Sequence, residues 1–180
     1  MRFTITGEWR RNRLLQTIIV LFLVYVVLLW MTNALLYFSR MGLTYDSVVE
    51  YYLGSEQRYL GPRSYAVLLE ISHFHLFAMG ILLLTLTHLM LFVPLDLRLK
   101  AWLIVVPFIA GIADEGAGWL IRFVSPSFAY LKITGFVTLQ VSLAVLIVVS
   151  LWSVIAAPPE PFIDNGNDGN ELTDSSGAPQ

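Results

Sequence analysis

Hydrophobic residues form four long runs along the chain, separated by shorter polar segments. Each run reaches or exceeds the roughly 20 residues that a helix needs to cross the hydrocarbon core of a bilayer. The predicted membrane-spanning helices cover about residues 14–38, 64–93, 101–123 and 131–156. The pattern therefore predicts an all-α integral membrane protein whose residues 1–156 form one four-helix transmembrane bundle.

Two polar segments carry further structural signals. Between the first two runs, Val48, Val49, Tyr52 and Leu53 recur at helical spacing ahead of Gly54. This spacing predicts a short amphipathic helix in the outer loop, lying on the membrane surface. After the last run, residues 157–180 contain five acidic groups and no basic one, and so we expect a disordered acidic tail.

Composition and charge place the chain in a lipid bilayer. Hydrophobic residues make up 57% of it and charged residues only 13%, about half the charged fraction of soluble domains. The absence of cysteine excludes disulfides, thiolate metal sites and c-type haem attachment within the chain. Basic residues form no patch beyond the N-terminal arginines, which argues against nucleic-acid binding.

Basic residues near the ends of the runs predict the orientation. The arginines ahead of the first run put the N-terminus in the cytoplasm of a bacterial-type inner membrane, and four crossings return the C-terminus to the same side. Arg98 and Lys100, in the predicted short loop after the second helix, agree with this orientation. Arg40, Arg58 and Arg63, in the outer loop, oppose it. The N-terminal residues concerned are Arg2, Arg10, Arg11 and Arg13.

All three histidines lie in the second run, which also contains Glu70. Ionisable groups in a bilayer are costly, usually face the interior of a helix bundle, and mark functional sites. At about 100° per residue, Glu70, His73, Gly80 and His88 share one helix face, whereas His75 points to roughly the opposite side. The shared face is therefore the predicted functional face, with His73 as its main candidate.

His73 and His88 are about 22 Å apart along the helix axis. This layout resembles a helix of the b-type cytochromes, in which two histidines on one face hold two haems stacked across the bilayer. The resemblance implies haem b and an electron-transfer role, in a larger respiratory assembly or a homodimer. No second helix supplies partner histidines, so the second axial ligand would be Met31, another residue type, or the same histidine of a second subunit.

A single metal ion is the alternative cofactor. Glu70 and His73 form an i, i+3 pair that presents two ligands on one side of a helix, and Asp114 and Glu115 are adjacent carboxylates in the third run. Such an oxygen and nitrogen set suits Zn, Fe, Mn or Cu. Helix tilt decides whether His73 and Asp114 lie at the same depth.

Two further readings need no cofactor. In the first, the acidic residues pair with Arg63 and Arg122 and hold the helices together, as in a non-catalytic membrane anchor or assembly subunit. In the second, the ionisable residues form a proton or ion pathway. The sequence contains no His-Glu-x-x-His, Gly-x-Ser-x-Gly or phosphate-binding glycine motif of the common hydrolases and transferases.

Overall fold

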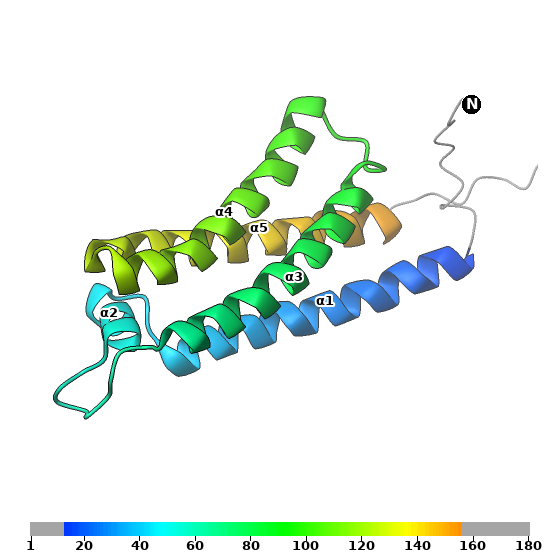
Figure 1. Cartoon of the computed structure of the whole chain (residues 1–180). Helices are drawn as coiled ribbons and strands as arrows, with labels where there is room; N and C mark the ends of the chain where they lie inside the picture. Colours follow the sequence, from blue (N-terminus) through cyan, green and yellow to red (C-terminus); the bar gives the residue numbers. More distant parts are fainter. Residues whose placement is uncertain (1–12, 156–180) are drawn as a thin grey trace, which may run out of the picture.

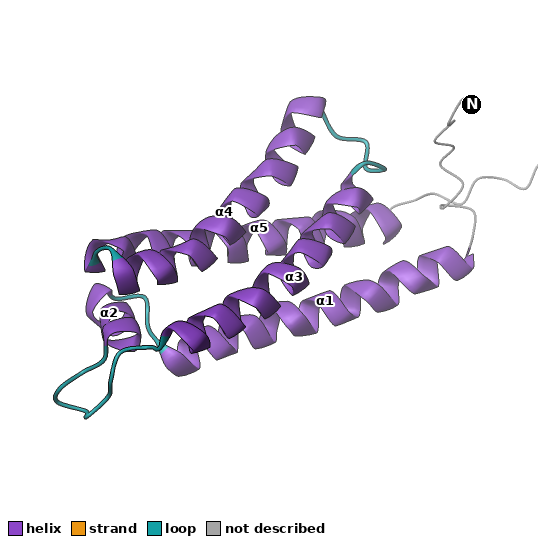
Figure 2. Cartoon of the chain, in the orientation of Figure 1, coloured by secondary structure: helices purple, strands orange, loops and turns teal. Residues whose placement is uncertain are grey.

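The computed structural model describes residues 13–155, which form helices joined by loops, with no strand in this range (Figure 2). Helix α1 spans Arg13–Arg40, α3 spans Tyr65–Met90, α4 spans Leu97–Phe123 and α5 spans Ala129–Ile155, with the short helices α2 at Tyr45–Leu53 and η2 at Pro126–Phe128. Four of these helices are long and apolar enough to cross a membrane. The predicted four-helix membrane fold is thereby confirmed, whereas the predicted tail lies outside the described residues.

Helix α4 begins earlier than the sequence predicts. The Asp96 side chain accepts a hydrogen bond from the Arg98 backbone nitrogen at 3.0 Å and caps the first turn. Arg98 and Lys100 therefore belong to α4 and not to a loop. The Lys100 ammonium reaches back to the Leu91 carbonyl at 3.2 Å, where it satisfies a free acceptor just beyond the end of α3.

Helix α5 is the centre of the bundle, because it packs against α1, α3 and α4. The α4–α5 contact is the most extensive and depends on Gly135: a Cβ there would lie 3.0 Å from the Asp114 backbone nitrogen. Small residues allow membrane helices to approach this closely. Helix α1 packs mainly on α5, and a groove lies between it and α3.

The surface helix predicted in the outer loop is α2, which lies across one end of the bundle (Figure 1). At this end α1 terminates, α3 begins and η2 joins α4 to α5. The buried Val48 and Tyr52 side chains fix α2 to the bundle by joining a hydrophobic cluster with Tyr37, Leu68 and Phe136. The bundle is thus closed by α2 at one end.

Candidate functional site

The two neighbouring histidines of α3 face opposite environments. His73 is exposed on the outside of the bundle, whereas His75 is half-buried and borders three internal cavities. The α3 residues that pack into the bundle include Leu68, Ser72 and Leu82. Because this face carries the close helix contacts, Glu70, His73 and His88 are all exposed, and of the three Glu70 also borders one of these cavities.

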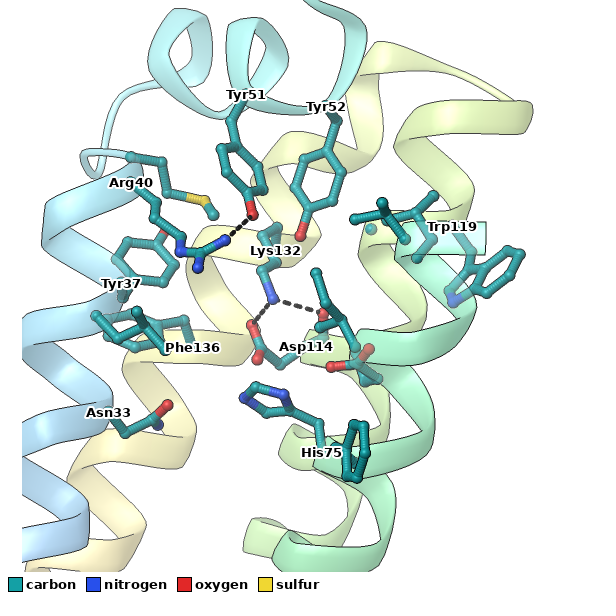
Figure 3. A pocket seen from close by; sticks show the side chains of 18 of the residues that line it. Asn33, Tyr37, Arg40, Tyr51, Tyr52, His75, Asp114, Trp119, Lys132 and Phe136 are labelled. Atoms are coloured by element: carbon teal, nitrogen blue, oxygen red, sulfur yellow. Dashed lines mark hydrogen bonds and ion pairs between the residues drawn. The ribbon is translucent and has the colours of Figure 1, made fainter. Parts of the chain in front are cut away.

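An ion pair between α4 and α5 lies at the centre of the site. The Lys132 Nζ atom is 2.9 Å from Asp114 Oδ1 and donates a hydrogen bond to the Asp114 carbonyl oxygen at 3.1 Å. Only 7% of Lys132 is exposed. The His75 imidazole points toward this pair (Figure 3), so that a titratable ring and a buried ion pair face the same space.

A second polar chain fixes the position of Glu115. The Ser72 hydroxyl donates to Glu115 Oε1 at 2.6 Å, and the Trp119 indole nitrogen donates to the same hydroxyl at 2.7 Å. These bonds link α3 to α4 and satisfy one oxygen of the carboxylate. Glu115 therefore lies beside the ion pair in a defined orientation.

Helix α2 covers this polar cluster with tyrosines. The Tyr52 ring packs against Gly118 so closely that a Cβ on this glycine would lie 2.9 Å from the ring and its hydroxyl. Burial raises the pKa of the Tyr52 phenol to about 12, against the lowering effect of nearby Lys132. The phenol is thus neutral at physiological pH. Beside it, Arg40 donates to the Tyr51 hydroxyl at 3.2 Å.

The space between α2 and the polar cluster is a cavity of about 450 Å³, which we call the head cavity. A second cavity of about 410 Å³, which we call the tail groove, runs between α1 and α3 and is lined mainly by apolar side chains. The two are adjacent, since both are bordered by Asn33, Leu36, Phe74 and His75. The head cavity, which contains the charged groups, therefore lies beside an apolar groove, and His75 borders both.

Comparison with known proteins identifies the chain at the level of a domain. A family described as a transmembrane helical domain matches residues 42–161, two thirds of the 180 residues. The chain belongs to this family, Aq_1264_TM. The match begins after α1 and so includes all of α2, α3, α4 and α5. No curated protein and no solved structure matches the chain significantly.

The structure separates the four residues that the sequence suggested as ligands of a single metal ion. Asp114 is held by Lys132 and Glu115 by Ser72, while Glu70 and His73 are exposed on α3. Among residues 13–155, no group of three or more His, Asp or Glu side chains is placed to hold a metal ion. The expected meeting of these four residues is absent because Lys132 and Ser72 hold the two carboxylates of α4, while His73 lies on the outside of the bundle.

Of the residues predicted to hold haem, Gly80 borders one of the three cavities, whereas His73, His88 and Met31 border none of the three. His73 and His88 are exposed, and Met31 is 50% exposed on α1. Gly80 has no atom within 4 Å of where a Cβ would stand, other than its own helix backbone and chain neighbours. The alternative pairing of an acidic residue with Arg122 is not observed either, because Arg122 donates instead to the Arg63 carbonyl at 2.9 Å.

The residue of this site that is hardest to recognise from the sequence is Lys132. Lys132 lies in the first turn of an apolar run, where a lysine is ordinarily placed at the membrane surface. The sequence does contain a signal for this ion pair. Asp114 and Lys132 lie on opposite sides of the Ser125–Pro126 turn, and this turn makes their two helices antiparallel neighbours. Two opposite charges on adjacent apolar helices at comparable depth predict an ion pair.

Proposed function

We propose that this membrane protein is a small redox component that binds a lipid-soluble carrier of the quinone class. The head of the carrier occupies the head cavity and its tail follows the tail groove. One observation carries the proposal: His75 is half-buried, makes no hydrogen bond within residues 13–155, and borders both the head cavity, which contains the ion pair, and the apolar tail groove between two membrane helices.

The free hydrogen-bonding capacity of His75 supports a ligand at this point. Within residues 13–155 its ring nitrogens make no hydrogen bond, whereas nearby Asp114 and Glu115 are both engaged. A neutral imidazole offers one donor and one acceptor. Because His75 is half-buried, a carbonyl or hydroxyl of a bound head group would supply a hydrogen bond that the described part of the chain does not, and so would stabilise the complex.

The charge of the head cavity favours a neutral head group. Its lining holds the cations Arg40 and Lys132 and the carboxylates Glu70, Asp114 and Glu115. Lys132 is already paired with Asp114, and so no excess of positive charge is left to bind a phosphate. Both volumes fall within the range of about 300–1,000 Å³ that is typical of small-molecule sites. A quinone head, which is neutral and bears carbonyl acceptors, meets these conditions.

The test uses a short-tailed quinone and the two neighbouring histidines. Trp119 borders the head cavity and Trp30 the tail groove, so saturable quenching of tryptophan fluorescence in nanodiscs reports binding. His75→Leu removes one hydrogen bond and should weaken binding about three- to tenfold. The matched control, His73→Leu, changes the same residue type two positions away on the outside and should leave binding unchanged.

Two outcomes of this titration would contradict the proposal. The first is quenching that rises without saturation in wild type and both variants, as expected of quinone dissolved in the lipid. The second is an equal loss of affinity in the two variants. An alcohol with the same alkyl tail serves as competitor: displacement at equal concentrations would show that only the tail is recognised.

Haem is the second candidate for the redox role, and the shared outward face of His73 and His88 is the observation that favours it. In this arrangement the histidines of two copies supply the axial ligands, since a haem iron accepts two histidines. Protein expressed with excess haem should then show a Soret band that is lost in His73→Leu and His88→Leu. Absence of the band in the wild type would exclude haem.

A further inference from the structure

The outward face of α3 carries polar groups at a depth where lipid cannot satisfy them. Helix α3 has 26 residues, or about 39 Å of length, against a hydrocarbon core of about 30 Å. A centred helix therefore projects by about three residues at each end. Glu70 lies five residues and His73 eight residues after Tyr65, so both fall inside the hydrocarbon core.

These side chains lack partners within the described part of the chain. Neither Glu70 nor His73 forms an ion pair or a hydrogen bond there, and the His73 ring packs edge-on against its neighbour Phe74, at 5.7 Å between ring centroids. Both are exposed. Glu70 lies at the edge of the head cavity and His73 outside it. A carboxyl and an imidazole exposed at this depth cost free energy, and a polar surface that covers them relieves that cost.

We propose that this face of α3, made of Glu70, His73, Phe77, Gly80 and His88, is the interface between two copies of the chain. The argument is self-complementarity of charge. In a two-fold dimer the same patch meets itself, and the parallel α3 helices bring Glu70 of one copy beside His73 of the partner subunit, twice. Each acceptor then faces a donor inside the membrane.

The shape of the face fits a close helix crossing. Gly80 lies between the two histidines at the edge of a cavity toward α4, and no atom lies within 4 Å of where its Cβ would stand, other than its own helix backbone and chain neighbours. The absence of a side chain at this position lets a second backbone approach. Phe77, one turn before Gly80, is 69% exposed and becomes buried against the partner helix in the dimer. The polar pair and the close approach therefore lie within three turns of one helix face.

The absence of cysteine from the chain makes disulfide cross-linking a direct test. Phe77→Cys in the otherwise native chain should form a disulfide-linked dimer when membranes are oxidised. Ile112→Cys is the control, because Ile112 is 66% exposed and lies near the middle of α4. It should stay monomeric under the same conditions. Gly80→Phe, added to Phe77→Cys, should reduce the dimer yield at least severalfold.

A second measurement separates dimerisation from folding. Glu70→Leu and His73→Leu make the face more apolar, so the monomer should stay folded in detergent by circular dichroism while the dimer fraction in native mass spectrometry falls. Equal cross-linking at Phe77 and Ile112, a monomer in lipid nanodiscs, or cross-linking of Phe77→Cys to a different protein alone would each overturn the proposal. These tests need no ligand, and so their outcome is independent of the quinone proposal.

Discussion

The Lys132–Asp114 ion pair offers the sharpest quantitative test of this fold. Lys132→Met removes the ammonium and leaves a carboxylate buried against α5, whereas Asp114→Ala leaves the ammonium without its partner. Removal of one member of a buried ion pair typically costs about 3–5 kcal/mol, because the remaining charge is neither solvated nor paired. Both single substitutions should therefore strongly lower the free energy of unfolding.

The geometry sets the size of the coupling between the two residues. At the observed Nζ–Oδ1 separation of 2.9 Å, two unit charges attract by about 6 kcal/mol at an effective dielectric constant of about 20. Desolvation of both charges offsets most of this attraction in the wild type. The double variant carries neither the attraction nor the desolvation cost, and we expect it to lose only about 1–2 kcal/mol.

The assay is reversible unfolding in mixed micelles as the detergent SDS is added, followed by circular dichroism and tryptophan fluorescence. Wild type, the two single variants and the double variant form a double-mutant cycle and are measured in one detergent. The coupling free energy between Lys132 and Asp114 should reach at least about 3 kcal/mol. Arg58→Met is the control, because the Arg58–Glu50 pair is 3.3 Å long with the Arg58 side chain 70% exposed. Loss of that pair should cost less than about 1 kcal/mol.

Additive effects would refute the reasoning. If the double variant loses as much stability as the two single variants together, the pair makes no net interaction in the membrane and Lys132 is solvated by another route. A loss below about 1 kcal/mol in each single variant would lead to the same conclusion. In either case the polar cluster would not be the fixed centre of the site.

Two further predictions concern the covered end of the bundle. Gly54 has a φ angle of 86°, and a Cβ there would stand 2.3 Å from the Leu60 carbonyl oxygen. Gly54→Ala should therefore lower the free energy of unfolding by about 1–3 kcal/mol and speed proteolysis of the loop after α2. Gly61→Ala is the control and should do neither, because the space around Gly61 is open. The pKa of Tyr52, raised by burial from 10.0 to about 12, favours the folded state by up to about 3 kcal/mol. That contribution is complete below pH 10 and is lost as the pH rises through about 12, because the unfolded chain ionises first. Unfolding titrations across this range should show the loss in wild type and not in Tyr52→Phe.

The sequence by itself determined how many times the chain crosses the membrane and where it bends. Backbone groups in lipid must be hydrogen-bonded within the segment, so a sufficiently long apolar run has to be a helix. The same local logic identified α2, whose apolar residues recur at helical spacing and end at Gly54. These features depend on neighbours along the chain and are therefore written in the residue pattern.

The tertiary structure decided which face of α3 points inward, and with it the candidate site. Polarity is a poor guide to this choice, because lipid and a helix interface are about equally apolar and the hydrophobic effect does not separate them. Helix packing and the hydrogen bond from Ser72 of α3 to Glu115 of α4 settle the rotation. They turn His75 toward the ion pair and His73 toward the lipid, although the two histidines are only two residues apart.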